Sequence, residues 1–313
     1  TIHNIAYQGK YGLDILEDTC GIGARDAHVV EYDGCANFMK GAIECADKVT
    51  TVSPTYAQEI LDPWFSHGLD GLLRQKQYKL CGILNGIDMA VNDPATDPAL
   101  AANYDVNTVQ DGKPICKKAM LEQFGMDQDG SPVMGMVTRL VGHKGLDLVR
   151  SVAEGLLQQG IQLVILGSGE HGYEAFFNDL AYRHPGRVGV YIGFNATLAQ
   201  QIYAGSDIFL MPSKSEPCGL SQMVACRYGA VPVVRETGGL KDSIKDSGDG
   251  QGNGFTFANY SAHDLYQACW RAKEGYWQEG WMTLVKRAMS CDFGWDVSAK
   301  SYAQMYKQVV NLW

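Results

Sequence analysis

The sequence predicts an α/β fold built on a doubly wound parallel sheet, preceded along the chain by part of a second domain. From residue 132 onward, five short apolar runs begin at residues 133, 161, 187, 208 and 230. Successive runs start 21 to 28 residues apart, which leaves room for a strand, a crossover helix and two loops, as in parallel βαβ units. Each run is apolar nearly throughout, as expected for strands that helices cover on both faces.

The predicted elements of this domain follow from the periodicity of its apolar residues. Helical spacing appears at 146–157 and again at 220–228. The sequence DSGDGQGNG at 246–254 predicts a flexible loop. Three further helices are predicted around 262–274, 276–289 and 295–310. The predicted strands are 133–138, 161–166, 187–192, 208–211 and 230–234.

Residues 1–80 have a different pattern: a loop-rich start, a helix near 37–46 and one strand at 48–52. Ser53 followed by Pro54 is a typical start of another helix. One strand cannot form a sheet, so the other strands of this layer are expected outside the sequence. We predict that 1–80 is the later part of one domain and 81–291 a complete second domain. Residues 292–313 are predicted to form a terminal helix that returns to the first.

Composition excludes several classes of protein. Of the 313 residues, 46% are hydrophobic and 19% charged, which argues against a mainly disordered chain. The net charge of −9 argues against a nucleic-acid partner. The nine cysteines include no CxxC pair or zinc spacing, so reduced thiols are favoured over disulfides or a structural metal. No apolar run is long enough to span a membrane.

Residues 167–172 fit the pattern GxGxxG after a strand, which raises the possibility of a dinucleotide site. Such sites place an Asp or Glu at the end of the next strand to hold the ribose. That strand ends at Ile192 with no acid nearby, so we reject hydride transfer. Either a tight turn or a close backbone approach to a ligand explains the glycines.

Chemistry-bearing residues are expected in loops that follow strands, because ligands of open α/β sheets bind at the carboxyl ends of the strands. The first such loop, TRLVGHKG at 138–145, places Arg139 and Lys144 before a helix, a combination suited to a phosphate or diphosphate. A pair of solvated surface cations is the alternative.

The second loop, SKSEPCGLS at 213–221, combines the carboxylate of Glu216 with backbone N–H groups in the first turn of a helix, at Gly219, Leu220 and Ser221. This pairing suits a ligand with a phosphate and a hydroxyl-rich part, although Glu216 alone would also stabilise the helix dipole. The third loop, with Thr237 and Gly238, offers further N–H donors.

Several motifs in order resemble bacterial glycogen synthase and plant starch synthase over essentially the whole chain. They are HNIAYQG, KVTTVSPTYAQEI, GILNGID, PATD, TRLVGHKG, IGF, SEPCGLSQ and RETGGLKD. The resemblance implies a GT-B fold of two Rossmann-like domains, with the donor between them. It also implies a retaining glycosyltransferase that moves glucose from ADP-glucose to the non-reducing 4-OH of an α-1,4-glucan. ADP-glucose, ADP and the glucan are then the partners, with no cofactor or metal.

The resemblance assigns roles to individual residues. Arg139 and Lys144 would neutralise the departing diphosphate, and Glu216 would contact the glucosyl ring. His3 and Asn85 would lie near the same sugar. Gly193 and Phe194 would line the nucleobase pocket. The backbone N–H groups around Gly219, Leu220 and Ser221 would hold phosphate.

One departure from the family is that its KxGGL motif has no counterpart, since TGGL at 237–240 is a different element. We therefore interpret Thr1 as a truncation point and expect weak or no activity from this chain alone. Alternatives are a UDP-sugar-dependent retaining transferase and a non-catalytic nucleotide- or glucan-binding module. The expected compartment is the cytoplasm, or a plastid in a plant or alga. Trp277 and Trp281 are interpreted as helix packing, with a carbohydrate platform left open.

Overall fold

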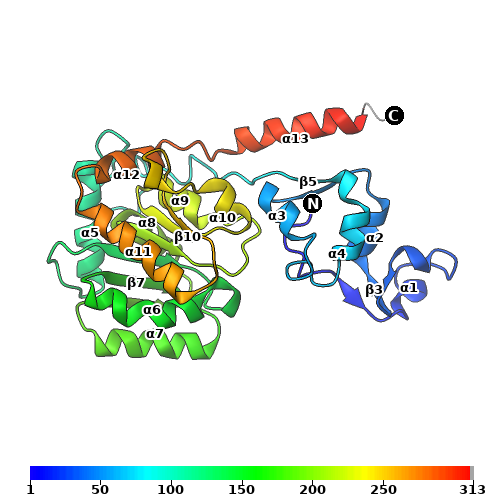
Figure 1. Cartoon of the computed structure of the whole chain (residues 1–313), viewed down its shortest axis with the longest axis horizontal. Helices are drawn as coiled ribbons and strands as arrows, with labels where there is room; N and C mark the ends of the chain where they lie inside the picture. Colours follow the sequence, from blue (N-terminus) through cyan, green and yellow to red (C-terminus); the bar gives the residue numbers. More distant parts are fainter. Residues whose placement is uncertain (311–313) are drawn as a thin grey trace. The chain divides into compact units, whose positions relative to one another are not determined.

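The computed structural model describes residues 1–310 and divides into two compact units (Figure 1). Unit 1 comprises Thr1–Asn85 together with the segment from Ser298, and unit 2 comprises Gly86–Val297. The boundaries expected from the sequence, 80/81 and 291/292, lie a few residues before these divisions.

Unit 2 is built on a six-stranded parallel sheet with the order β11-β10-β9-β6-β7-β8. The five predicted strands are confirmed, each within one residue at either end. The sixth, β11, was not predicted because it has only three residues and follows a glycine-rich loop. The strands are β6 (Val133–Val137), β7 (Gln162–Gly167), β8 (Val188–Ile192), β9 (Ile208–Met211), β10 (Val231–Arg235) and β11 (Phe255–Phe257).

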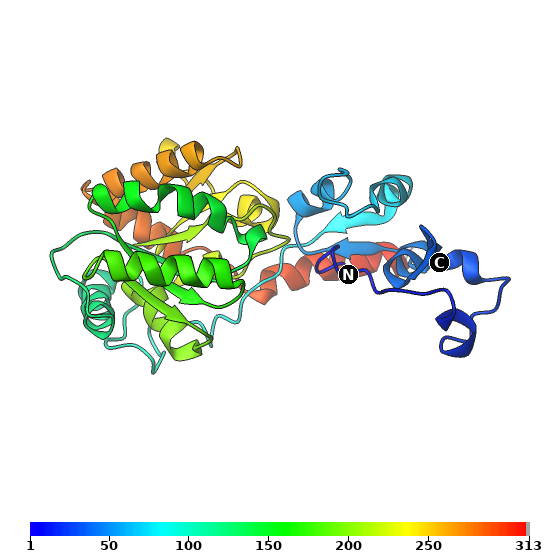
Figure 2. The same cartoon turned by 90° about the horizontal axis from the view of Figure 1, so that it is seen from below.

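Helices cover both faces of this sheet, so the prediction of a doubly wound arrangement is confirmed (Figure 2). Helices α6 and α11 pack together, as do α5 and α8. The helices are α5 (Val109–Gln123), α6 (Leu146–Gln158), α7 (His171–Arg183), α8 (Ala196–Gly205), α9 (Ser221–Arg227), α10 (Gly238–Ser243), α11 (Ala262–Tyr276) and α12 (Trp281–Met289), with short 3₁₀ turns η3 (Gly142–Lys144) and η4 (Ser247–Asp249).

Two predictions within unit 2 need correction. The helix expected at 276–289 begins only at Trp281, because α11 continues to Tyr276 and a turn ending at the N-cap Gly280 separates the two helices. The loop at 246–254 is not a loose connection. Its Asp246 carboxylate binds Arg271 through two hydrogen bonds of 2.9 Å, and Asn253 Nδ2 donates to Ser243 O.

The strand order places the turning point of the sheet between β6 and β9. The chain runs outward from β6 through β7 to the edge strand β8, then returns to β9 on the other side of β6. At such a point the loops that follow the two adjacent strands diverge and leave room for a ligand. The loops after β6, β9 and β10 therefore begin at neighbouring positions on one edge of the sheet.

Unit 1 contains more β-structure than the sequence predicts. The strand expected at 48–52 is present as β4 (Val49–Thr51), but it pairs in parallel with β5 (Leu80–Gly82), and a separate antiparallel sheet has the order β1-β3-β2. The prediction of a single strand was wrong because the other strands have only two or three residues and show no clear alternation. They are β1 (Lys10–Tyr11), β2 (Glu31–Tyr32) and β3 (Cys35–Asn37).

The helix start predicted at Ser53 and Pro54 is confirmed, and a second helix of unit 1 has a side-chain cap that was not predicted. Ser53 Oγ accepts a hydrogen bond from Tyr56 N at 3.1 Å, and Pro54 is at the first helical position. The side chain of Asn37 caps the helix that begins at Phe38 by accepting from Lys40 N. Ser298 Oγ donates to Leu84 O. The helices are α1 (Ile15–Asp18), α2 (Phe38–Cys45), α3 (Pro54–Glu59), α4 (Asp70–Gln75) and, from its Ser298 onward, α13 (Trp295–Val310), with turns η1 (Ala27–Val29) and η2 (Gln77–Lys79).

None of the helices in the part of the chain that the structure describes has the length and apolarity needed to cross a membrane.

Candidate functional site

The candidate site lies in unit 2, where three loops leave the carboxyl edge of the sheet. The loop after β6 carries Arg139 and Lys144, the loop after β9 carries Glu216, and the loop after β10 carries Thr237. Since β6, β9 and β10 are consecutive in the sheet, these residues come from neighbouring strand ends although the sequence separates them widely.

Backbone contacts connect the three loops. Lys214 N donates to His143 O at 2.9 Å, and Gly239 N donates to Glu216 O at 3.1 Å. Gly145 ends the first loop with φ +76°, and a Cβ added there would lie 2.0 Å from Pro212 O. Only glycine allows this approach of the first loop to the second, because a side chain would both strain the backbone and collide with the carbonyl.

The Lys144 ammonium and the Glu216 carboxylate form an ion pair across two of these loops. Lys144 Nζ lies 2.6 Å from Glu216 Oε2, and the same oxygen accepts a hydrogen bond from Ser213 Oγ at 3.0 Å. Glu216 is only 7% exposed. The pair is therefore partly shielded from water, and each charge compensates the desolvation of the other.

Arg139 is exposed, and its guanidinium forms no ion pair within residues 1–310. The same loop has a positive environment. Burial, followed by the positive charges of Lys144 and Arg139, lowers the pKa of His143 and so favours its neutral form. The loop after β6 thus offers one uncompensated cation to an anionic ligand.

The turn before α9 presents backbone donors. The N–H groups of Gly219 and Leu220 donate to no backbone acceptor in the described part of the chain, as is usual before the first turn of a helix. Ser221 begins α9, and Gly219 has φ +67°. Leu220 is exposed. These groups lie on the same loop as Glu216, so a carboxylate and N–H donors lie a few residues apart.

The loop after β10 packs closely on the Glu216 loop. Thr237 is fully buried and is the N-cap of α10. A Cβ added at Gly238, whose φ is +42°, would lie 2.0 Å from Glu216 O. The backbone of Gly238 therefore lies directly against the backbone of Glu216.

Gly193 and Phe194 follow the edge strand β8, at the same edge of the sheet. Gly193 N donates to Gly167 O at 2.9 Å, which holds this turn against the end of β7. The Phe194 side chain is 88% exposed. Its ring is therefore available for stacking with a planar ligand.

Some residues that shape the site were not predicted from the sequence. Arg235 Nη1 donates to Lys214 O at 2.7 Å, and its guanidinium lies 5.5 Å from the ring centroid of Tyr260. The Tyr260 hydroxyl donates to Asp147 at the start of α6. Arg235 is the first residue of the motif RETGGLKD and could have been singled out, whereas no local pattern identifies Tyr260.

The arrangement combines a free guanidinium, a paired ammonium, a shielded carboxylate and backbone N–H donors. These groups suit a ligand with an anionic part and a hydroxyl-rich part. The residues described by the structure contain no cluster of three or more His, Cys, Asp or Glu side chains that could hold a metal ion.

Comparisons with known proteins identify the family. Residues 1–75 match the family model of the starch synthase catalytic domain, and residues 122–275 match that of the glycosyl transferases group 1. The chain is 48% identical to the glycogen synthase of Geobacillus thermodenitrificans over 317 aligned positions, covering 99% of this chain. The chain belongs to the glycogen and starch synthase family. It spans 65% of the length of that glycogen synthase.

Solved structures of this family and of more distant proteins support the GT-B fold. The catalytic domain of starch synthase IV from Arabidopsis thaliana, bound to ADP and acarbose, is 37% identical, with a TM-score of 0.90. The match covers 99% of this chain and 66% of that one. Sucrose-phosphate synthase from Thermosynechococcus elongatus is similar in fold alone, at 19% identity and a TM-score of 0.58, covering 87% of this chain and 60% of that one. The chain is thus a GT-B glycosyltransferase by fold.

Two residues that the resemblance assigns to the glucosyl group of a glycogen or starch synthase lie in unit 1. His3 is exposed, and Asn85, the last residue of this stretch of unit 1, is half-buried. The other predicted site residues lie in unit 2. Within that unit the structure brings Lys144 into contact with Glu216 and the backbone of Gly238 against Glu216, while Phe194 remains at the edge strand.

Proposed function

We propose that this protein transfers glucose from ADP-glucose to the 4-OH at the non-reducing end of an α-1,4-glucan, with retention of configuration. The observation that carries the proposal is the contact between Lys144 and Glu216 beside the unpaired Arg139, on loops that follow adjacent strands. Membership of the glycogen and starch synthase family supports it, as do the ADP and acarbose bound to the Arabidopsis relative. The bacterial relatives favour the bacterial cytoplasm as the compartment.

The charges of the site suit the departure of a nucleoside diphosphate. As the bond from the glucosyl C1 to the phosphate oxygen breaks, negative charge grows on the diphosphate and positive charge on the sugar. Arg139 and Lys144 would stabilise the first charge, and the Glu216 carboxylate the second. Because both charges are larger in the transition state than in the substrate, such groups accelerate the reaction rather than only tightening binding.

The acceptor step then forms a bond between C1 and the glucan 4-oxygen on the face that the diphosphate leaves. We propose that the leaving phosphate takes the proton of this hydroxyl, so that ADP departs protonated and no side chain acts as the base. The N–H groups of Gly219, Leu220 and Ser221 would hold the phosphates during this step. The loop with Thr237 and Gly238 would support them from behind, since Thr237 N already donates to Arg235 O and Gly239 N to Glu216 O. Gly193 and Phe194 would contact the adenine, and His3 and Asn85 the transferred glucose.

A titration of three nucleotides tests the donor. Isothermal titration calorimetry of the chain with ADP, ADP-glucose and UDP-glucose should give the tighter binding for the adenine nucleotides. Arg139→Ala should weaken ADP binding by about 10- to 100-fold, the usual range for losing a hydrogen bond to a charged group. In a protein extended to the length of its relatives, the same substitution should reduce transfer of labelled glucose to glycogen by about 10²- to 10³-fold.

Lys118→Ala is the matched control. Lys118 lies on α5, is exposed, and lies 3.9 Å from Glu122 in a loose surface pair, so its removal should change neither measurement. Tighter binding of UDP-glucose would establish the UDP-sugar alternative instead. Nucleotide binding without any transfer, also in a protein extended to the length of its relatives, would indicate a binding module. An unchanged Arg139→Ala variant would show that the site is assigned wrongly.

A further inference from the structure

Unit 2 contains a cavity of about 380 Å³ at the amino edge of its sheet, away from the loops of the candidate site. Asp207, which lines it, immediately precedes β9, whereas the candidate site follows the last residues of the strands. Lys113 and Lys117 of α5 and the aromatic residues Tyr276, Trp277 and Trp281 also line it. Its volume lies within the range of small-molecule sites.

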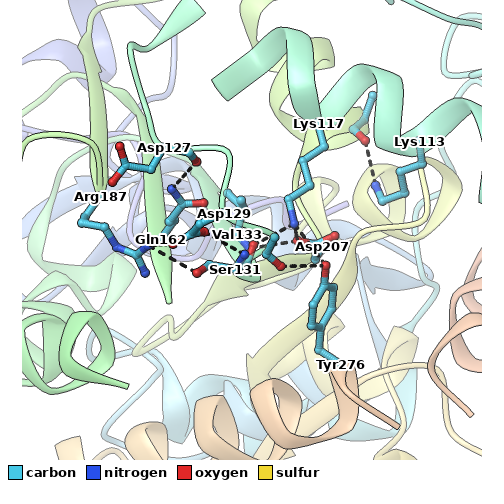
Figure 3. Close-up of polar contacts among 12 residues, drawn as sticks. Lys113, Lys117, Asp127, Asp129, Ser131, Val133, Gln162, Arg187, Asp207 and Tyr276 are labelled. Carbon is cyan, nitrogen blue, oxygen red and sulfur yellow. Dashed lines mark hydrogen bonds and ion pairs between the residues drawn. The ribbon is translucent and has the colours of Figure 1, made fainter. Parts of the chain in front are cut away.

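The polar wall of this cavity carries no uncompensated cation. Lys117 Nζ donates to Asp207 Oδ2 at 2.7 Å, to Ser131 O at 2.8 Å and to the Tyr276 hydroxyl oxygen at 3.2 Å (Figure 3). Figure 3 shows these side chains converging on one another from α5, the start of β9 and the end of α11. An ammonium has three hydrogens, so Lys117 has no donor left for an anion.

Lys113 is satisfied in the same way. Its ammonium donates to Ala204 O and Tyr228 O, each at 2.9 Å, and to Tyr203 O at 3.3 Å, and the side chain is buried. A phosphate or carboxylate would therefore meet two lysines that are already occupied, beside the negative charge of Asp207. This chemistry disfavours an anionic ligand and favours a neutral one.

The aromatic wall offers the flat surfaces that a neutral, hydroxyl-rich ligand requires. The Tyr276 ring lies edge-on to Trp277, with centroids 4.9 Å apart, and edge-on to Trp281, at 5.6 Å. Trp277 is 60% exposed, so much of its indole surface is open to solvent. Sugar rings combine apolar C–H faces with a rim of hydroxyls, and they match an indole surface beside hydrogen-bonding groups.

We propose that this cavity binds an α-1,4-glucan segment, at a site separate from the one where the donor reacts. The choice of glucan rests on the proposed function, since the geometry by itself specifies a neutral carbohydrate. A sugar ring lies against Trp277, and one of its hydroxyls donates to the Tyr276 hydroxyl oxygen. The glucan is then held on unit 2 while its end is free to react elsewhere.

Maltoheptaose is the probe for this site. Titrated into the whole 313-residue chain and followed by tryptophan fluorescence and calorimetry, it should bind saturably, also in the presence of saturating ADP. Trp277→Ala should weaken binding about tenfold or more, as for a central aromatic contact. Trp277→Phe, which keeps a ring, should restore part of it, and Tyr276→Phe should give an intermediate loss.

Trp270→Ala is the matched control, since Trp270 lies on α11, which Trp277 directly follows, is 42% exposed and does not line the cavity. It should bind maltoheptaose like the unaltered chain. Circular dichroism and thermal unfolding verify that each variant is folded. The ADP affinity of Trp277→Ala should equal that of the unaltered chain.

Three results would overturn the proposal: no saturable binding of maltoheptaose, equal binding by the folded Trp277→Ala variant, or displacement of the sugar by ADP. A change of oligomeric state in Trp277→Ala, with sugar binding unaltered, would assign the aromatic surface to contact between chains. Failure of this cavity proposal can be distinguished from failure of the proposed function. Binding of ADP-glucose without maltoheptaose refutes only the cavity, and Trp277-dependent sugar binding without ADP-glucose refutes only the donor assignment.

Discussion

Lys144 and Glu216 compensate one another's charge before any ligand is present. At 2.6 Å, with Ser213 also donating to the carboxylate, this contact holds the ammonium at the edge of the proposed donor site. A donor phosphate must then compete with Glu216 for Lys144. In the proposed reaction the carboxylate would therefore weaken diphosphate binding in the ground state and would contribute only as positive charge develops on the sugar.

Replacing Glu216 by glutamine should separate these two effects. Glu216→Gln keeps the shape of the side chain but weakens its bond to Lys144, so ADP should bind about three- to tenfold more tightly. This gain is smaller than that of a full charged hydrogen bond, because the amide oxygen of glutamine can still accept from the ammonium. Glucose transfer should nevertheless fall by about 10²-fold because the stabilising charge is lost. Calorimetry with ADP measures the first quantity, and a glycogen transfer assay on a protein extended to the length of its relatives measures the second.

Ser213→Ala is the control for that substitution, since it removes one hydrogen bond from a neutral donor to Glu216 and leaves both charges in place. It should alter ADP affinity far less than Glu216→Gln does. Weaker ADP binding in Glu216→Gln would show that the carboxylate positions Lys144 for the diphosphate rather than competing with it.

Gly145 is a second position where one residue determines the site. Both its positive φ and the nearby Pro212 carbonyl exclude a side chain. Gly160 has a similar φ of +81° with nothing within 4 Å of an added Cβ. Urea unfolding should show a loss of about 1–2 kcal/mol for Gly160→Ala, from backbone strain alone. Gly145→Ala should reduce the free energy of unfolding by at least about 1 kcal/mol more than Gly160→Ala does. It should also abolish ADP binding. Equal losses would mean that the loops can move apart freely.

At the scale of elements, the loop at 246–254 is fixed to α11. Burial opposes ionisation of Asp246, but the Arg271 guanidinium and the N–H groups of Thr256 and Gly248 outweigh it and hold the pKa of this carboxyl below its ordinary value. Arg271 also donates to Thr256 O at 2.7 Å, so one side chain joins the loop, β11 and α11. Composition alone predicts flexibility here, because it does not show that a distant arginine binds the loop.

Arg271→Gln should reduce the free energy of unfolding by about 1 kcal/mol at pH 7, a modest value because the pair is partly exposed. The folded pKa of Asp246 lies below its unfolded value of 3.8, so this stabilisation is present above that pH and is lost as pH falls through the lower folded value. The difference between variant and unaltered chain should shrink below about pH 3.8.

Urea unfolding at pH 7 and near pH 3 measures that difference. Arg183→Gln is the comparison, since Arg183 forms ion pairs with Glu154 and Asp179 on the surface and should contribute little. A difference between Arg271→Gln and the unaltered chain that stays constant with pH would place the contribution of Arg271 in its bond to Thr256 O instead.

For the whole molecule, the predictable parts are those with a strong local pattern. The buried strands of unit 2 were found because each is a continuous apolar run, and the helix start at Ser53 and Pro54 was found because helix capping is local. The other short strands of unit 1 and β11 were missed because two or three residues carry no periodicity, whereas β4 was found in the longer apolar stretch at 48–52.

The loops of the candidate site could be predicted, but the contacts between them could not. Strand spacing indicates that Arg139, Lys144 and Glu216 follow strands, yet it does not indicate that β6 and β9 are neighbours. The pairing of Lys144 with Glu216 and the close approach of Gly145 to Pro212 both depend on that adjacency. The cavity between α5, α11 and α12 is a further tertiary feature, formed by residues that share no motif.

The adjacency of β6 and β9 also has a kinetic consequence. The segments β7, α7, β8 and α8 lie between β6 and β9 in the sequence, so the contact of Lys144 with Glu216 closes a long loop of chain. Because the entropy of closing such a loop must be lost before the contact forms, we expect this contact to form late in folding. A fluorescent ADP analogue that binds these loops would then report the insertion of β9 during refolding, and its signal should lag behind the recovery of helical circular dichroism.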